Sequence, residues 1–266
     1  MIKNLSFSNF YSFADETVID FSLGKKPTSS GYDIIVDNER FNKALAVVGA
    51  NGSGKTQLLK PLAFLSWFGA SSFLGGDPKQ DIPCGAHLLH METPSRFELE
   101  FRVSGVDYRY QLELTPKQVL FEALFEKTST QYSYLFKREK SEQGYSFKQK
   151  GFPFPKAQAE KLRGNASLIS AAHSYDIAEA KPFIDFFEHI KTNVVSTGRQ
   201  HFQHGDILGA AEKFQKAPDL LKRMSDAMCE FDLGLSSVEI KKLTARDKTG
   251  REEPVFVPFG LHTTDD

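Results

Sequence analysis

Residues 49 to 56 read Gly49-Ala50-Asn51-Gly52-Ser53-Gly54-Lys55-Thr56. This octapeptide fits the pattern G-x-x-x-x-G-K-[ST], a loop that joins a strand to a helix and cradles the phosphates of a nucleotide. Its glycines permit left-handed backbone conformations, so successive amide groups can point inward at phosphate oxygens. The helix that follows offers unpaired N–H groups and the positive end of its dipole to the same anion. The sequence therefore predicts an α/β protein with a nucleotide site.

The stretches on either side of the loop provide the context that this motif requires. Residues 44–48 are continuously apolar, which predicts a strand buried on both faces of a sheet. Residues 57–68 place apolar side chains at helical spacing. The alternative is a glycine-rich turn without a function, and the complete motif between a strand and a helix argues against it.

The side chains of the loop predict which residues hold the nucleotide and its metal ion. Lys55 supplies a mobile cation for the β- and γ-phosphates, and Thr56 offers a hydroxyl group to Mg²⁺. We therefore expect ATP and Mg²⁺ as cofactors, with Thr56 as the metal ligand. The expected nucleotide-binding residues are Asn51, Gly52, Ser53, Gly54, Lys55 and Thr56. The pattern identifies no catalytic residue.

The other elements are predicted from the same periodicities. Strands are expected at residues 2–7, 17–22, 33–36, 97–103, 108–114, 119–125, 238–240 and 255–257. Helices are expected at residues 167–174, 177–190 and 218–231. Turn residues between the three strands that follow residue 96 predict an antiparallel meander. We expect two domains: a P-loop nucleotide-binding lobe at residues 1–165, with a β-subdomain at about 97–150, and residues 166–266, a helical segment and the start of the second half of the ATPase core.

The composition limits the class of protein. The chain has 266 residues, 40% of them hydrophobic, and a formal net charge of −1. That apolar share excludes a wholly disordered chain, and the near-zero charge argues against a protein that coats DNA. Two cysteines form no disulfide framework, and neither a signal peptide nor an apolar run long enough to span a bilayer is seen. We therefore expect a cytoplasmic protein without membrane contact.

Several landmarks of the chain lie outside the loop. They are the opening Ile2-Lys3-Asn4-Leu5, the corner Asn9-Phe10-Tyr11-Ser12-Phe13, the meander, and two later runs, Phe231-Asp232-Leu233-Gly234-Leu235 and Phe259-Gly260-Leu261-His262. Together with the octapeptide, they resemble the ATP-binding proteins of the AAA-15/AAA-21 group, ABC-type ATPase heads related to the OLD and SMC families. The resemblance covers most of the chain. It implies an incomplete ABC-type P-loop NTPase head, α/β in class, with an antiparallel β-subdomain and a helical segment.

The resemblance also implies a biological role. Members of this group include ATPases of bacterial antiphage defence systems, such as the Septu and PARIS ATPase subunits, in which nucleotide-dependent assembly senses infection or controls an effector. The implied partners are ATP, further copies of the chain in an ABC-type dimer or larger oligomer, an effector protein such as a nuclease, and DNA. The alternative is an SMC-like DNA-repair or recombination ATPase, which would predict long heptad repeats that the sequence lacks.

Some features of ABC heads are missing from these residues. The resemblance implies a signature motif, a strand that ends in Asp-Glu, and a glutamine that senses the γ-phosphate, for which Gln200 and Gln203 are the candidates. No Asp-Glu strand or complete signature is found. We therefore expect an N-terminal part of a longer protein, which binds ATP and hydrolyses it poorly.

Three further patterns each leave two interpretations open. Either Ser12 or one of the aromatic residues of the corner at 9–13 lies near the nucleotide base, or the corner belongs to the core. Cys84, His87 and His90 have a spacing that could hold zinc, or they lie in an ordinary loop. The basic excess of residues 117–163 indicates either a solvated surface or a nucleic-acid contact.

Overall fold

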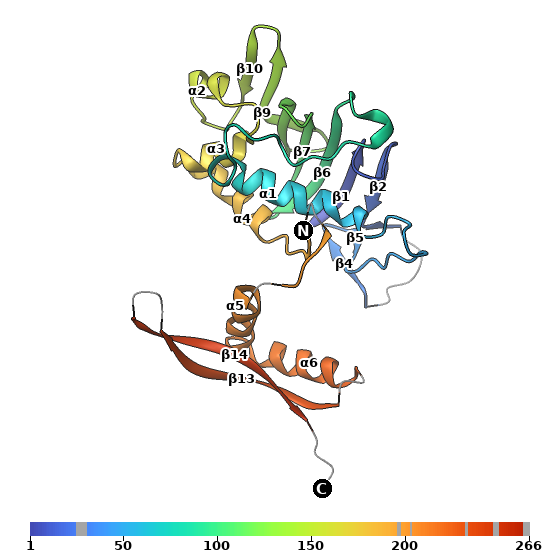
Figure 1. Cartoon of the computed structure of the whole chain (residues 1–266), viewed down its shortest axis with the longest axis vertical. Coiled ribbons are helices and arrows are strands. Elements are labelled where there is room, and N and C mark those ends of the chain that lie inside the picture. The colour runs from blue at the N-terminus through green and yellow to red at the C-terminus, as the bar shows by residue number, and fades with distance from the viewer. Residues whose placement is uncertain (25–30, 196–197, 203, 232–233, 247–249, 263–266) are drawn as a thin grey trace. The chain divides into compact units, whose positions relative to one another are not determined.

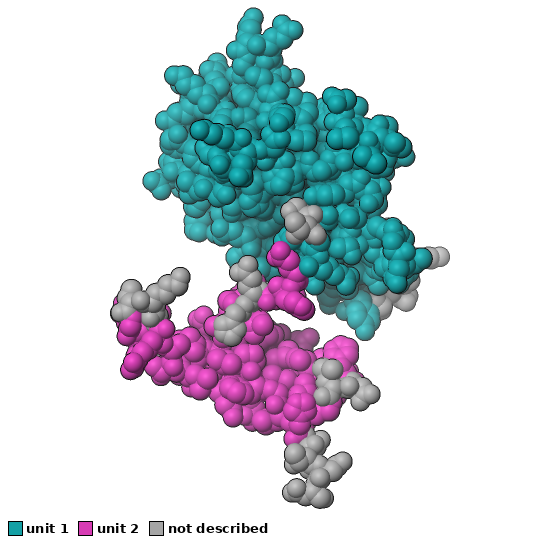
Figure 2. Space-filling view, in the orientation of Figure 1, with its two compact units in different colours: residues 1–199 teal, residues 200–266 magenta. Residues whose placement is uncertain are grey.

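A computed structural model describes the chain except for residues 25–30, 196–197, 203, 232–233, 247–249 and 263–266 (Figure 1). The chain forms two compact units, residues 1–199 and residues 200–266 (Figure 2). The boundary that the sequence predicts near residue 165 separates the two expected halves of an ATPase core, and it stays a prediction.

The first unit is built on a seven-stranded antiparallel sheet with the strand order β10-β9-β8-β7-β6-β1-β2. The predicted meander is confirmed by β6, β7 and β8, and it continues into β9 and β10, which the sequence pattern did not identify. The strands are β1 (Ile2–Ser8), β2 (Thr17–Asp20), β6 (Ser95–Val103), β7 (Val106–Leu114), β8 (Val119–Lys127), β9 (Tyr132–Ser141) and β10 (Gly144–Gln149).

A second, small sheet lies between β2 and the octapeptide loop in the chain. It has the order β3-β5-β4, with β3 at Ser22–Leu23, β4 at Asp33–Val36 and β5 at Glu39–Asn42. β4 confirms the strand predicted at residues 33–36 and forms a hairpin with β5, in which Asp37 and Asn38 turn the chain with φ angles of 49° and 65°.

Helices α1, α3 and α4 pack together against the large sheet (Figure 1). α1 follows the octapeptide loop as predicted, after one 3₁₀ turn. Gly69 lets α1 approach α4 closely, because a Cβ atom at this position would lie 2.6 Å from the Phe187 ring. The helical segments of this unit are η1 (Gln57–Leu59), α1 (Lys60–Gly75), η2 (Leu88–His90), α2 (Lys156–Lys161), α3 (Leu168–Ser174), η3 (Ala178–Ala180) and α4 (Lys181–Glu188), followed by the short strands β11 (Val194–Val195) and β12 (Gly198–Arg199).

The predicted strand at residues 44–48 is wrong for this structure. These residues form no strand, and the exposed fractions of Leu45, Val47 and Val48 are 44%, 46% and 89%. The apolar run carries the pattern of a buried strand, but burial on both faces needs neighbouring strands and covering layers. Among the described residues, no strand pairs with this segment. An apolar composition therefore does not predict burial of a segment that has no neighbouring strands or covering layers.

The second unit consists of two helices and a long antiparallel hairpin. The helices are α5 (His204–Gln215) and α6 (Pro218–Cys229), and the strands are β13 (Leu235–Arg246) and β14 (Glu252–His262). The predicted helix near 218–231 and the strands near 238–240 and 255–257 are confirmed, and both strands are longer than predicted. α5 was not predicted. Across the described parts of both units, no helix is long and apolar enough to cross a membrane.

Candidate nucleotide-binding site

The octapeptide loop leads from the exposed segment 44–48 into α1. Gly52 and Gly54 adopt φ angles of 84° and 87°, a conformation that side-chain-bearing residues rarely adopt. Gly49 is required for a different reason, because a Cβ atom there would lie 2.9 Å from the Ser53 hydroxyl oxygen. The three glycines of the motif are therefore explained by the backbone path and by the tight fold of the loop.

Lys55 folds back over its own loop. Its Nζ atom donates hydrogen bonds to the carbonyl oxygens of Gly49 and Ala50, each at 2.6 Å. The backbone N–H of Ser53 also donates to the Ala50 carbonyl, at 3.3 Å. The ammonium group is thus held at the mouth of the loop, where an anion can compete for it, since a charged acceptor binds an ammonium more strongly than a carbonyl does.

The start of the helix leaves both a hydroxyl group and N–H groups for other partners. The first bonds of the helix run from Leu58 N to Gly54 O, at 3.1 Å, and from Leu59 N to Thr56 O, at 3.3 Å. The Thr56 side chain makes no capping hydrogen bond. A helix start that no side chain caps attracts anions through its N–H groups and its dipole. The half-buried Thr56 hydroxyl is suited to reach a metal ion bound to such an anion.

The corner at residues 9–13 lies against the loop, and its members differ in their surroundings. Ser12 is next to the loop, because its Cβ atom lies 3.9 Å from the position of a Cβ atom on Gly54. Phe10 is 1% exposed and packs edge-on against Phe97, with ring centroids 5.1 Å apart. Phe13 packs against Phe7 in the same way at 5.2 Å. The corner is therefore core at the two phenylalanines and borders the loop at Ser12.

Tyr11 belongs to a cavity that the sequence did not predict. Its ring lies 3.7 Å from Nζ of Lys60, a nearly buried residue in the first turn of α1. Burial lowers the pKa of Lys60 and raises that of Tyr11. The cavity holds about 280 Å³ and is mainly apolar, with Trp67 and Val194 in its wall. The sequence signal for it was a lysine at the start of a helix that has no other charged residue.

The structure does not bring the other candidate residues together. Cys84 is buried, which raises the pKa of its thiol to about 12, and the rings of His87 and His90 lie 5.6 Å apart. Within the part of the chain that the structure describes, no three His, Cys, Asp or Glu side chains form a group that could hold a metal ion. Gln200 belongs to the second unit, and Gln203 lies outside the described residues.

The chain is similar to two sets of known proteins. The family model AAA_21, described as "AAA domain, putative AbiEii toxin, Type IV TA system", matches residues 45–262. The chain is also 40% identical over 68 residues to the cytochrome c biogenesis ATP-binding export protein CcmA of Nitrobacter winogradskyi. That similarity covers 25% of this chain and 32% of the relative, so the chain spans about a third of the length of this curated protein.

Proposed function

We propose that this chain, which belongs to the AAA_21 family of AAA domains, binds ATP and Mg²⁺ through residues 51–56 as the nucleotide-binding part of an ABC-type ATPase. One observation carries the proposal: the loop combines left-handed glycines at 52 and 54 with a lysine whose ammonium is held at its mouth. Left-handed glycines allow the loop amides to turn toward a bound phosphate, and the lysine supplies the cation; these are the two parts of a phosphate site. The family and the relative's printed name, an ATP-binding export protein, support the choice of ATP.

Each residue of the loop has a proposed role. The backbone amides of residues 51–54 and the start of the helix receive the phosphates, while Lys55 leaves its two carbonyl acceptors to bind the β- and γ-phosphates. Thr56 contributes its hydroxyl group to Mg²⁺. Ser12 lies close enough to Gly54 to contact the bound nucleotide.

We propose that this chain binds ATP but turns it over slowly. Hydrolysis requires a group that positions or activates the attacking water. No carboxylate in the described residues is assigned to that task, because the expected Asp-Glu strand is not found in the sequence. In an ABC-type mechanism a second copy would complete the site, so a homodimer or larger oligomer is part of the proposal.

The proposed biological role is control of an effector in a bacterial antiphage defence system. It is supported by the resemblance of the chain to defence ATPases and by the family description, which mentions a toxin of a type IV toxin–antitoxin system. The effector, for which a nuclease is the proposed chemistry, and any contact with DNA belong to the same proposal. An SMC-like repair ATPase receives less support, since the longest described helix is α1, with 16 residues.

The test of nucleotide binding is a titration of the 266-residue chain with ATP and Mg²⁺, in parallel with Lys55→Ala and the control Lys79→Ala. Lys79 is an exposed lysine outside the loop. We expect wild type and the control to bind alike, and Lys55→Ala to lose at least tenfold in affinity, about 1.4 kcal/mol. Equal affinities in all three proteins would refute the assignment of the site. Rapid turnover that depends on Lys55 would refute the proposal of slow hydrolysis and leave the proposal of ATP binding intact.

A further inference from the structure

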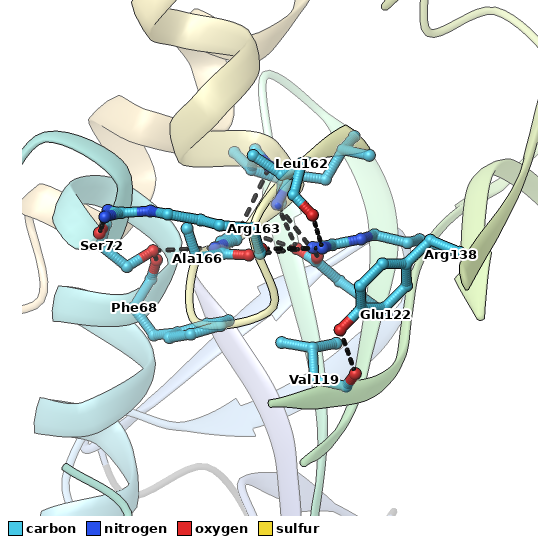
Figure 3. A network of polar contacts seen from close by, with 12 residues as sticks. Phe68, Ser72, Val119, Glu122, Arg138, Leu162, Arg163 and Ala166 are labelled. Carbon is cyan, nitrogen blue, oxygen red and sulfur yellow. Dashed lines mark hydrogen bonds and ion pairs between the residues drawn. The ribbon is translucent and has the colours of Figure 1, made fainter. Parts of the chain in front are cut away.

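The far end of the 16-residue helix α1 is bound by one arginine (Figure 3). Nη2 of Arg163 donates to the carbonyl oxygens of Ser72, Phe73 and Gly76, at 2.7, 2.6 and 3.0 Å. The last carbonyls of a helix have no partner within the helix, and a cation there also complements the negative end of the dipole. Arg163 therefore caps α1 from outside.

Two serines strengthen the same connection. The Ser72 hydroxyl donates to the Phe68 carbonyl at 2.6 Å and accepts the N–H of Ser167 at 2.9 Å. The Ser170 hydroxyl donates to the Ala70 carbonyl at 3.1 Å and accepts the N–H of Phe73, also at 3.1 Å. The segment 163–170, which we call the connector, is thus joined to α1 by backbone and side-chain bonds.

The other side of the connector is held by a fully buried arginine on β9. Nη1 of Arg138 donates to the Ala166 carbonyl at 3.0 Å, and Nη2 donates to the carbonyls of Leu162 and Arg163 at 2.8 and 2.9 Å. In the register of the sheet, Arg138 pairs with Phe147 on β10, the edge strand. The β9–β10 hairpin and α1 therefore contact the same short connector (Figure 3).

Glu122 on β8 also binds the connector. Its carboxylate lies 3.7 Å from Arg138 and accepts hydrogen bonds from Leu168 N and from the Ser167 hydroxyl, the latter at 2.7 Å. The Tyr110 hydroxyl donates a further bond to it at 2.9 Å. Polar groups in a buried network interact strongly with one another. Here the hydrogen bonds of both arginines are made by their terminal nitrogens, while Nε of Arg138 and Nε of Arg163 are buried without a hydrogen-bond partner among the described residues.

The two ends of α1 are held in different ways. Its first turns are held by packing, with Lys60 over the Tyr11 ring and Phe64 and Leu65 buried in the core, whereas its last turn is also held by polar bonds. Between described residues, no side-chain hydrogen bond ties residues 49–59 to another element; Lys55 bonds to its own loop. Farther along α1, the Ser66 hydroxyl donates to the Phe187 carbonyl at 2.7 Å. The last turn of α1 then bonds to the connector. Because a helix is stiff along its axis, a displacement of the first turn of α1 is passed on to its last turn.

We infer that Arg163 is a positioning residue that couples the occupancy of the octapeptide loop to the β9–β10 hairpin. Binding of a nucleoside triphosphate at the loop shifts α1, and Arg163 passes this shift through the connector to Arg138 and its hairpin. The inference rests on the proposed nucleotide site. It assigns the hairpin as the part of the first unit that reports the nucleotide state.

The test is hydrogen–deuterium exchange of the whole chain with and without a non-hydrolysable ATP analogue and Mg²⁺. In wild type we expect protection of the loop peptides and a change in the peptides of residues 132–149. Arg163→Met should keep the protection at the loop, with analogue affinity within about threefold of wild type, and lose the change at the hairpin. Arg163→Lys, which keeps the cation, should restore part of it. Arg96→Met, at an exposed ion pair, is the control and should behave as wild type.

The outcomes separate the inference from the proposed function. Loop protection without a change at the hairpin in wild type would overturn the coupling and leave nucleotide binding intact. A hairpin response that persists in Arg163→Met would overturn the role of Arg163. If neither region of wild type responds, the proposed function fails and the inference falls with it. A lower melting temperature of Arg163→Met with an unchanged hairpin response would reveal a purely structural role, which also overturns the inference.

Discussion

Nζ of Lys55 lies 2.6 Å from the carbonyl oxygen of Gly49, the residue that opens the same loop. The contact closes the octapeptide on itself. The ammonium group that we propose as a ligand of the phosphates is therefore hydrogen-bonded to carbonyl oxygens of its own loop. Two features keep the loop in this shape: the left-handed glycines and the close approach of Gly49 to Ser53. The geometry of the loop therefore leads to direct predictions.

Gly54→Ala should weaken ATP binding, because Gly54 has a φ of 87° and lies beside Ser12. Holding alanine in a left-handed conformation costs roughly 1–2 kcal/mol, and relaxation of that strain would turn the loop amides away from the phosphates. Calorimetric titration with ATP measures the effect. Gly105→Ala is the matched control, since Gly105 has a similar φ of 83° in a remote hairpin. It should lose stability and keep its ATP affinity. Equal affinity losses in both variants would contradict the prediction.

Gly69→Ala should destabilise the first unit through α1 and α4. The new Cβ atom would lie 2.6–2.9 Å from three ring atoms of Phe187, and such overpacking costs about 1–3 kcal/mol. Trp67 is the one tryptophan of the chain, so its fluorescence in a urea titration reports this unit. Gly75→Ala, at the end of the same helix, meets only an ordinary contact of 3.7 Å and should change stability by no more than about 0.5 kcal/mol. A neutral Gly69→Ala would show that the helices separate without cost.

Val48→Lys distinguishes the structure from the sequence-based expectation for residues 44–48. In the structure Val48 is 89% exposed, so the substitution should change the free energy of unfolding by no more than about 0.5 kcal/mol. A strand buried on both faces would instead lose several kcal/mol, because the ammonium group would be buried without a partner. Val119→Lys is the control of the same residue type, at a fully buried position of β8, and should unfold the unit.

Cys84 should resist thiol reagents in the folded protein. The side chain is 3% exposed, and burial raises its pKa to about 12, so almost no thiolate is present near neutral pH. Cys229 is half-buried and should react first. A colorimetric thiol assay on wild type and Cys229→Ser measures this: the variant should react only after denaturant is added. Rapid reaction of the folded variant would show that Cys84 is accessible.

The same thiol predicts the dependence of stability on alkaline pH. The folded-state pKa lies above the reference value of 9.0, so the folded state holds this proton more tightly than the unfolded chain does. Its contribution to stability is therefore complete below pH 9 and is lost as the pH rises toward about 12. Cys84→Ala should lack this part of the alkaline loss in urea titrations. Parallel curves for the two proteins would contradict the assigned pKa.

The sequence was most informative where a short pattern has one physical solution. The octapeptide requires positive φ angles at its inner glycines, and the structure has them at Gly52 and Gly54. The apolar and aromatic runs of the meander predicted β6 to β8, and in β6 and β7 these runs alternate because one face of the strand is buried. By contrast, one of the two buried positions of β9 is occupied by a charged residue, Arg138, so its pattern did not predict a strand with a buried face.

The sequence by itself determined the loop, the helix that follows it, and many of the other elements. These depend on backbone conformations and on side-chain periodicity within a few residues. Only the tertiary structure decided which apolar segments are covered, and so it left residues 44–48 exposed while burying Arg138 and Glu122 completely. Burial and pairing depend on neighbours that are distant in the chain. The contacts of Arg163 with the end of α1, some 90 residues away in sequence, have that origin.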